Sequence, residues 1–476
     1  MYKSIIAYSL MVFAVMEFTP LQAETIAITG ATIIDGNGGS PLKNGTLVID
    51  GNRIIAVGKT RDIDVPAGAR IIKAEGKYII PGLMDTNVHL FIEMAVETLA
   101  KYEGQYDKLI IEAAQVALKA GVTTVFDSYG PRQPLVDARD AINLGEEIGS
   151  RIYLAGNIVG YDGPFSGDFW PDAKATTSPS FVKKINDMWV QDVGRRLVWM
   201  APEQLGGALE PYLKKDIDFV KYGASGHSIG EMHFLTFSEK AQDVIVKTVK
   251  GAGLTVQTHT TSVESLRIAV EAGVDLLQHC DVTGPVVVPD STIKMMAERQ
   301  IPCAPLTMTV LGEEARIKFL KVFGASQPEA NQEFIDSIQI SRQNVRKMLD
   351  AGVPLLLSTD SYLNSKRVEE WFGISDAVES LTVLGEGHFH WLKAMEERGM
   401  DAMTMLMSAT RDIARAYKID KDLGTLEKGM IADLLILDEN PLKSSGNYKK
   451  IHMIMKDGRK VDRDTLPTRR FLTQAN

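Results

Sequence analysis

The sequence has few cysteines, no excess of positive charge and no second long hydrophobic run. Only Cys280 and Cys303 are cysteines among 476 residues, which excludes a cysteine-based zinc cluster and a small disulfide-stapled fold. Lys and Arg number 52 against 61 Asp and Glu, so the formal net charge is −9. This balance argues against sequence-independent binding to nucleic acid or anionic lipid. What is present, 45% hydrophobic and 24% charged residues, is typical of a globular protein with a sizeable core.

Residues 1–23 have the pattern of a secretory signal peptide. Lys3 supplies a positive charge, residues 5–16 form a mostly apolar run, and Ala23 precedes Glu24 at a small-residue cleavage position. The alternatives are a membrane anchor and a frayed terminal helix, but the run is shorter than the roughly 20 residues that span a bilayer. We therefore expect an exported, periplasmic or secreted protein, with no membrane attachment after cleavage.

Short strands and turns occupy both ends of the remaining chain. Runs that alternate apolar with polar residues fill residues 26–79, separated by turns rich in Asp, Asn and Gly. The same pattern returns near the C-terminus, where Asp457 and Gly458 predict a tight turn. We expect both ends to build one small β-sandwich domain around a central barrel. The expected boundaries are 24–80 and 424–476 for the small domain and 81–423 for the barrel.

The middle of the chain repeats a short apolar strand followed by an amphipathic helix. Several of these helices precede a glycine, as at Gly121, Gly253 and Gly273, which is expected at a helix C-terminus. Strands that alternate with helices in this way predict an α/β fold of the (β/α)8 TIM-like barrel type, and an open doubly wound sheet is the alternative. The expected strands cover residues 78–85, 123–127, 151–155, 218–222, 254–259, 274–279, 301–306 and 354–358.

Side chains suited to metal binding stand where five of these strands end. The candidates are His89, Lys221, His259, His279 and Asp360. The active site of such a barrel lies at the carboxyl ends of its strands, and imidazole and carboxylate groups suit zinc and similar ions. One histidine at a strand end is more often a buried, hydrogen-bonded residue, but five such positions together favour a site.

These candidates, together with motifs near both ends, resemble the metal-dependent amidohydrolase superfamily. The resemblance covers nearly the whole chain after residue 23, and its motifs lie at residues 33–36, 81–89, 424–429 and 432–434. It implies an enzyme that cleaves an amide-like C–N bond of a small molecule (a urea, carbamate or amide). It also implies one or two divalent metal ions per chain, zinc first, with cobalt, manganese and iron as alternatives.

The resemblance further implies a role for each of the five candidates. All five would hold metal, with Lys221 carboxylated on its side-chain nitrogen by carbon dioxide. The alternative for Lys221 is a rim residue whose ammonium reaches solvent. Asp360 would take a proton from the metal-activated water and pass it to the leaving amine. His279 would oppose the charge that develops on the carbonyl oxygen.

Asn87 is where the chain departs from the superfamily pattern, which usually has His-x-His where this chain has Asn87-Val88-His89. An amide oxygen is a weaker donor than imidazole, so the metal position served by the first strand should bind weakly or stay empty. The alternative is that Asn87 only hydrogen-bonds neighbouring groups. Asn-x-His at this place resembles the subgroup that contains phenylurea hydrolase and molinate hydrolase.

Residues outside this cluster are less informative. For Tyr222 and His227, after the fourth strand, we expect substrate contacts, and a glycine-rich connecting loop is the alternative. The aromatic segment at residues 165–170 suggests a lid, although such residues more often serve packing. His388 is expected to be structural. The two cysteines lie beside apolar strands, where a buried thiol is usually inert.

Two further functions stay open at this point. One is a periplasmic peptidase or N-acyl amino acid hydrolase, which an exported address would suit. The other is a barrel that has lost catalysis and acts as a binding protein, which the loss of the first histidine would favour. A small-molecule substrate and a homo-oligomeric state are expected, without a nucleic-acid partner.

Overall fold

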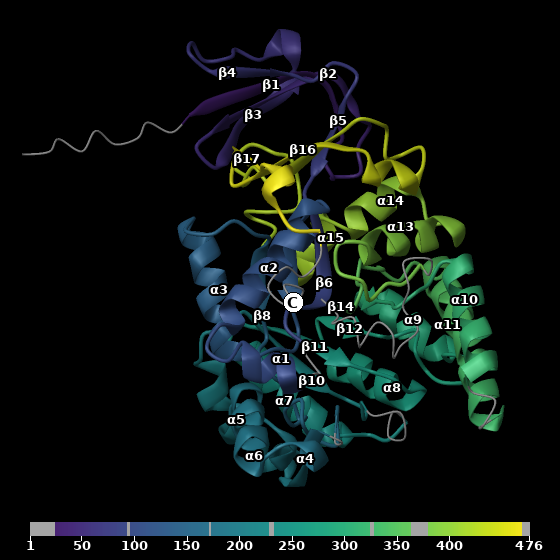
Figure 1. Cartoon of the computed structure of the whole chain (residues 1–476). Helices are drawn as coiled ribbons and strands as arrows, with labels where there is room; N and C mark the ends of the chain where they lie inside the picture. The colour runs from purple at the N-terminus through teal and green to yellow at the C-terminus, as the bar shows by residue number, and fades with distance from the viewer. Residues whose placement is uncertain are drawn as a thin grey trace, which may run out of the picture.

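The protein consists of a small β domain and a larger barrel of strands and helices (Figure 1). The computed structural model describes residues 24–92, 96–170, 173–227, 233–323, 328–362 and 379–468. The expected signal peptide at residues 1–23 lies outside these ranges. The predicted α/β class, with a TIM-like barrel and a β domain formed from both termini, is confirmed. The domain boundaries remain predictions.

The small β domain is one sheet with the strand order β17-β16-β15-β5-β1-β2-β3, in which β4 also pairs with β1. Its alternating residues face two cores. Along β15, Leu434 and Ile436 belong to the core of the small domain, whereas Leu435 and Leu437 belong to the barrel core. One sheet therefore covers its own interior and also packs on the barrel. Its strands are β1 (Thr25–Ile33), β2 (Leu42–Asp50), β3 (Arg53–Lys59), β4 (Arg70–Lys73), β5 (Tyr78–Pro81), β15 (Leu434–Leu437), β16 (Ile451–Lys456) and β17 (Arg459–Lys460).

The barrel strands run parallel in two groups, β13-β12-β11-β10-β9 and β14-β6-β7-β8. The third predicted strand is β8, and Gly156, with φ 73°, turns the chain before a further short strand, β9. β8 pairs with β7 and β9 with β10, so this segment joins the two groups. The strands are β6 (Leu83–His89), β7 (Val122–Asp127), β8 (Arg151–Leu154), β9 (Ile158–Val159), β10 (Phe219–Gly223), β11 (Thr255–His259), β12 (Leu276–Gln278), β13 (Cys303–Ala304) and β14 (Ser361–Tyr362).

The prediction of a regular eighth strand is wrong. Residues 354–358 form only an isolated bridge between Leu355 and Cys303, and regular pairing comes later, where β14 pairs with β6. Pro354 has no N–H to donate to a ladder, and Asp360 interrupts the extended chain with φ 54°. The segment still closes the barrel, because the Thr86 N–H donates to the Leu357 carbonyl at 3.1 Å.

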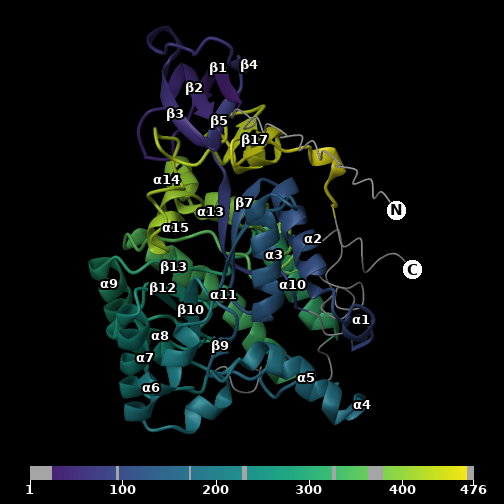
Figure 2. The same cartoon turned by 90° about the vertical axis from the view of Figure 1, so that its left-hand side faces the viewer.

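Amphipathic helices surround the strands on the outside (Figure 1, Figure 2). In α7, Ala241, Ile245 and Val249 are buried on one face, and the Ser238 hydroxyl accepts the Ala241 N–H at 3.3 Å as a helix cap. The helices are α1 (Val96–Lys101), α2 (Tyr106–Lys119), α3 (Arg132–Leu144), α4 (Ala173–Thr176), α5 (Pro179–Val190), α6 (Pro202–Leu213), α7 (Glu239–Gly251), α8 (Val263–Ala272), α9 (Asp290–Arg299), α10 (Val310–Phe323), α11 (Pro328–Asp350), α13 (Gly387–Glu397), α14 (Ala402–Ser408) and α15 (Arg411–Ala416). The 3-10 turns are η1 (Thr60–Asp62), η2 (Arg195–Trp199), η3 (Ser445–Lys449) and η4 (Arg463–Thr465). Within the part of the chain that the structure describes, no helix has both the length and the apolar character needed to cross a bilayer.

A hydrogen-bonded floor fills the barrel below the strand ends. Tyr417, which follows α15, stacks on Phe126 with ring centroids 3.7 Å apart. Its hydroxyl donates to Gln257 Oε1 at 2.7 Å, and Gln278 Nε2 donates to the same oxygen at 2.9 Å. These bonds satisfy the Tyr417 hydroxyl and Gln257 Oε1 in the interior, and the side chains occupy the barrel beneath its carboxyl end.

The two cysteines form a disulfide, which corrects the expectation of two separate buried thiols. Cys280 follows β12, Cys303 begins β13, and the bond links them across 23 residues of sequence. Their Cα atoms are 6.0 Å apart, a separation that disulfides commonly span. The sequence could not show this pairing, because it depends on β12 and β13 being neighbours in the sheet.

Candidate active site

The structure brings the five predicted metal-site residues to the carboxyl end of the barrel. His89 ends β6, His259 ends β11 and Lys221 lies within β10, while His279 follows β12 and Asp360 precedes β14. His89 Nε2 lies 2.9 Å from Asp360 Oδ1. The rings of His259 and His279 have centroids 4.9 Å apart. The four basic side chains are almost fully buried, so they form a cluster inside the protein.

Strand alternation decides which neighbours share this cluster. Lys221 points into the barrel, and successive side chains on a strand point to opposite faces. Tyr222 accordingly points outward, where its hydroxyl donates to Gln242 Oε1 of α7 at 2.9 Å. Tyr222 is fully buried there. The structure therefore does not bring Tyr222 to the predicted substrate site.

His279 and Asp360 have left-handed backbones, with φ 59° and 54°. Residues other than glycine rarely adopt this conformation, and it costs about 1–3 kcal/mol. At His279 it overrides the alternation, because Gln278 bonds Gln257 in the interior while the His279 ring lies beside His259. Strained residues of this kind concentrate at functional sites.

Two imidazole nitrogens in the cluster are buried without a hydrogen-bond partner, namely Nε2 of His259 and Nδ1 of His279. Burial lowers the pKa of His279 to about 3. Burial and the neighbouring His279 hold the pKa of His259 well below its ordinary value. Both rings are therefore neutral near pH 7. A buried polar atom without a partner is unfavourable, and a neutral imidazole nitrogen is a common metal ligand.

Asp360 is the ionised acid of the cluster. Its Oδ1 accepts hydrogen bonds from Asn87 Nδ2 at 2.8 Å and from His89 Nε2 at 2.9 Å. Burial alone would raise the pKa of Asp360, but the neighbouring His279, His89 and Lys221 outweigh burial and hold the pKa well below its ordinary range. The carboxylate thus stays charged.

Asn87 uses both ends of its side-chain amide within the cluster. Its nitrogen donates to Asp360, and its Oδ1 accepts from the Ser128 hydroxyl and from Lys221 Nζ, the latter at 3.3 Å. Lys221 Nζ also donates to Ser128 Oγ at 3.0 Å. Burial lowers the pKa of Lys221 to about 8, although Asp360 and Asp127 oppose this shift. Sequence reasoning missed Ser128, whose available signal was its position at the end of β7.

The donor chemistry of the cluster fits a divalent metal ion. No group of three His, Cys, Asp and Glu side chains in the described ranges is arranged so that it could hold a metal ion. Lys221 is not a residue of these types, and it offers oxygen atoms only after carboxylation. Two unpartnered neutral imidazole nitrogens beside a charged carboxylate are nevertheless the ligand types that zinc and similar ions prefer.

Aromatic side chains form one wall of the cluster. His227 Nδ1 lies 3.0 Å from the Asp168 carbonyl oxygen, and its ring is 4.5 Å from that of Phe169. Phe169 in turn stacks on Tyr129 with centroids 4.4 Å apart. The Tyr129 carbonyl lies 3.3 Å from Nδ1 of His89. The predicted aromatic segment at residues 165–170 therefore lies beside His227 and the metal-site candidates.

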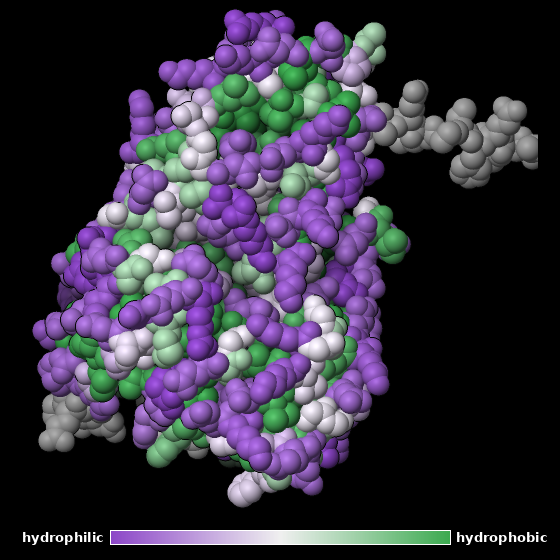
Figure 3. Space-filling view, turned by 180° about the vertical axis from the view of Figure 1, so that it is seen from behind, coloured by the Kyte–Doolittle hydropathy of each residue, from purple (hydrophilic) through white to green (hydrophobic). Residues whose placement is uncertain are grey.

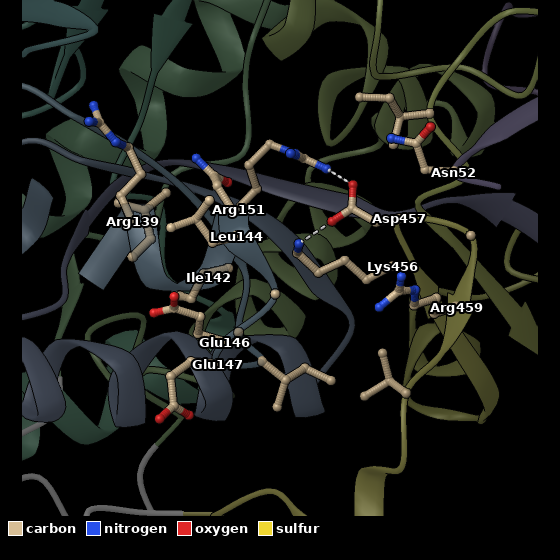
Figure 4. Close-up of a pocket in the computed structure, with 18 of the residues that line it drawn as sticks. Asn52, Arg139, Ile142, Leu144, Glu146, Glu147, Arg151, Lys456, Asp457 and Arg459 are labelled. Carbon is tan, nitrogen blue, oxygen red and sulfur yellow. Dashed lines mark hydrogen bonds and ion pairs between the residues drawn. The ribbon is translucent and has the colours of Figure 1, made fainter. Parts of the chain in front are cut away.

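A large cleft lies elsewhere, between the small β domain and the barrel (Figure 4). Its volume is about 1450 Å³, and none of the predicted site residues line it. Its charged side chains are mostly paired, as where Asp457 bonds both Arg151 and Lys456. The size of this cleft therefore gives no guide to the predicted site residues.

Comparisons with known proteins agree with this geometry. A model of the Amidohydrolase family matches residues 78–461. The solved structure of molinate hydrolase has a TM-score of 0.87 and 36% identity, covering 95% of this chain and 97% of that one. Phenylurea hydrolase B has a TM-score of 0.84 and 32% identity, covering 94% and 99%.

Curated relatives match either over a short segment or at lower identity. N-acyl-D-aspartate deacylase of Alcaligenes xylosoxydans xylosoxydans is 40% identical over 74 residues, and the chain spans only 14% of that protein's length. Imidazolonepropionase of Anaeromyxobacter sp. (strain K) is 22% identical over 435 residues, which is 83% of this chain and 84% of that protein. With the family model and two long structural matches, the chain belongs to the amidohydrolase family. The predicted resemblance and the prediction of an enzyme are confirmed.

Proposed function

We propose that this amidohydrolase uses a divalent metal ion to hydrolyse an amide-like C–N bond in a small urea, carbamate or amide, with phenylurea-type compounds as the first candidates. The observation that carries the proposal is the pair of buried, unpartnered nitrogens on His259 and His279 beside the ionised Asp360. The similarity to molinate hydrolase and phenylurea hydrolase B supports the substrate class.

The residues of the cluster have distinct tasks in this proposal, and Asp360 has two. Lys221 (as a carbamate), His259 and His279 hold the ion, and His89 and Asp360 form a second position of lower affinity. When bound, the ion activates water and polarises the scissile carbonyl group. Asp360 accepts the proton of the attacking water and returns it to the leaving nitrogen. Zinc is the first candidate, with cobalt, manganese and iron as alternatives.

Carboxylation of Lys221 converts a buried cation into an oxygen ligand. The neutral amine attacks carbon dioxide, an N–C bond forms and one proton leaves the nitrogen. Without carboxylation, a protonated Lys221 would repel a metal cation, and the two neutral histidines beside it carry no charge that would offset this repulsion. The complete burial of Nζ supports this role over the alternative of a rim lysine.

The aromatic wall supports a substrate with a flat apolar group. Phe169 and His227 lie against each other next to the cluster, and aromatic rings favour stacked or edge-on contacts with other rings. His227 is thus the remaining candidate for a substrate contact, whereas Tyr222 is not. An N-acyl amino acid hydrolase is the second candidate function, favoured by the local similarity to N-acyl-D-aspartate deacylase.

We also propose that the mature enzyme is exported and assembles as a homo-oligomer. The disulfide between Cys280 and Cys303 supports an oxidising compartment. Apolar side chains gather over the small β domain at the top of the view in Figure 3, and Ile71 of β4 is 48% exposed. Exposed apolar area of this kind is common at subunit contacts. Light scattering of the purified protein measures the subunit number.

The decisive experiment combines metal analysis with an activity panel. Freshly purified, unchelated protein should contain at least one divalent ion per chain. It should hydrolyse at least one compound among phenylureas, carbamates, N-acyl amino acids and dipeptides. Lys221→Ala should lose both metal and activity, because a methyl group offers no oxygen ligand. Protein without stoichiometric metal, or a Lys221→Ala variant with full activity, would overturn the proposal.

A further inference from the structure

We propose that Ser128 is a positioning residue that orients the Lys221 side-chain nitrogen for carboxylation and then holds the resulting carbamate. This inference rests on the proposed function, because it concerns the modification of Lys221. No motif of the sequence pointed to Ser128, and its role is not needed to explain the fold.

Ser128 is fixed in place by the strand that precedes it and by its neighbour. It follows β7 directly, and its N–H donates to the Val88 carbonyl at 3.1 Å, between Asn87 and His89. Its side chain is fully buried. The hydroxyl oxygen therefore lies at a defined point of the cluster, without water competing for its hydrogen bonds.

The hydrogen bonds around Ser128 run in one direction. An ammonium group can only donate, so Lys221 Nζ donates to Ser128 Oγ at 3.0 Å. The single Ser128 proton is then given to Asn87 Oδ1, and Asn87 Nδ2 donates to Asp360 Oδ1 at 2.8 Å. Ser128 is thus an acceptor for Lys221 and a donor to Asn87 at the same time.

The same arrangement suits both states of the lysine. Carboxylation joins Nζ to the carbon of carbon dioxide, releases one proton from the amine and leaves a single N–H on the carbamate nitrogen. Ser128 Oγ can accept that remaining N–H, just as it accepts one from the amine. Because Ser128 and Asn87 already occupy hydrogen-bonding directions of Nζ, the new carboxylate has to project away from them. Ser128 therefore selects one orientation of the carbamate.

Removal of the Ser128 hydroxyl should reduce the carboxylation of Lys221 more than it reduces the stability of the fold. We would equilibrate carbon-dioxide-depleted protein with ¹³C-labelled bicarbonate and follow the carbamate signal by ¹³C NMR, with zinc-dependent activity measured on the same samples. In Ser128→Ala, half-saturation should need at least about tenfold more bicarbonate than in wild type, because the single N–H of the carbamate loses its acceptor. The free amine is affected less, because it keeps its hydrogen bond to Asn87 Oδ1. Saturating bicarbonate should restore most of the activity.

Ser150→Ala is the matched control, because Ser150 is also fully buried. Its hydroxyl lies within hydrogen-bonding distance of the carbonyls of Ala114 and of Val122, which begins β7. This variant should keep the wild-type bicarbonate requirement even if it unfolds more easily. Ser128→Thr, which keeps a hydroxyl, should approach wild type. If Ser128→Ala does not fold, Ser128→Cys keeps the volume with a weak acceptor and must show the same shift.

The outcomes separate this inference from the proposed function. A carbamate signal in wild type with an unchanged bicarbonate requirement in the Ser128 variants would overturn the role of Ser128 alone. An active, metal-loaded wild type without a carbamate signal and without bicarbonate dependence would overturn the carboxylation of Lys221, and the role of Ser128 with it. A shift in the Ser128 variants, absent from Ser150→Ala, is the expected result.

Discussion

The two ends of the barrel both gather charged side chains, but they differ in whether those side chains form ion pairs with one another. At the carboxyl end, nitrogens of His259 and His279 are buried without partners. At the opposite end, beside the large cleft, Arg139 pairs with three aspartates. Arg151 there pairs with Asp457 (Figure 4). The smaller and incomplete cluster is the catalytic candidate, and the larger cleft is a region of structural ion pairs.

The backbone shows the same contrast. Asp457 has φ 50° and the following Gly458 has φ 73°, but this pair is the tight turn of the hairpin between β16 and β17, which requires such angles. His279 and Asp360 have similar angles without a hairpin turn to explain them. At the carboxyl end, unpartnered imidazole nitrogens and left-handed residues therefore occur together in one cluster, which is the reason to choose it as the candidate site.

The strongest test of this contrast removes the ionised acid of the carboxyl end. Asp360→Asn should keep its neighbours in place but lose about 10²–10⁴-fold in kcat, because an amide cannot accept the proton of water. Much of the metal should remain, because Lys221, His259 and His279 are unchanged. Steady-state kinetics with elemental analysis measures both quantities. Near-full turnover in this variant would remove Asp360 from the mechanism.

A second test adds a metal ligand to the carboxyl end. Asn87→His should raise zinc affinity at the weaker position by about tenfold or more, because imidazole binds zinc better than an amide oxygen does. Activity need not rise, since the Asn87 bonds to Ser128 and Asp360 are lost. Titration of metal-free wild type and variant with zinc is the measurement. Equal stoichiometry and affinity would leave Asn87 as a hydrogen-bonding residue only.

A substitution at the opposite end of the barrel should change the stability of the protein and leave its activity unchanged. Asp457→Asn breaks the ion pairs to Arg151 and Lys456 and should lower the free energy of unfolding by about 1–2 kcal/mol. The loss is moderate because 35% of the Asp457 side chain is exposed, where solvent screens the charge. Denaturant unfolding measures the loss, and kcat per folded molecule should not change. A large fall in kcat would mean that the two ends are coupled.

The smallest effect concerns a buried histidine that does have a partner. His388 Nε2 lies 3.1 Å from the Ala120 carbonyl, and burial lowers its pKa to about 3. Below pH 6.5 the unfolded chain binds a proton at this histidine and the folded chain does not, so stability is lost as pH falls. Between pH 6.5 and 5.5, the free energy of unfolding should therefore fall by about 1 kcal/mol more in wild type than in His388→Gln. Unfolding of both proteins at each pH tests this, and identical pH slopes would contradict a buried, neutral His388.

The hydrophobic periodicity of the chain and the glycines after its helices made much of the fold predictable. The apolar faces of α7 and α8 and the glycines that follow them were readable, because a helix of 3.6 residues per turn must bury one stripe. The strand-end positions of His89, Lys221 and His259 followed from strand lengths. Tyr222 shows a signal that was available but not used, since strand alternation places it opposite Lys221. The irregular eighth strand was harder to predict from the sequence, because its pairing depends on the turn at Asp360.

The sequence by itself determined the barrel, the two-ended β domain and the set of side chains at the carboxyl end, because hydrophobic period and strand ends are local properties of the chain. Only the tertiary structure decided the partners of those side chains. Asn87 meets Asp360 across 273 residues of sequence, Ser128 meets Lys221 across 93, and Cys280 meets Cys303 because β12 and β13 are neighbours. Periodicity specifies which face of a strand a residue occupies, but contacts between strands depend on register and closure, which exist only once the barrel has formed.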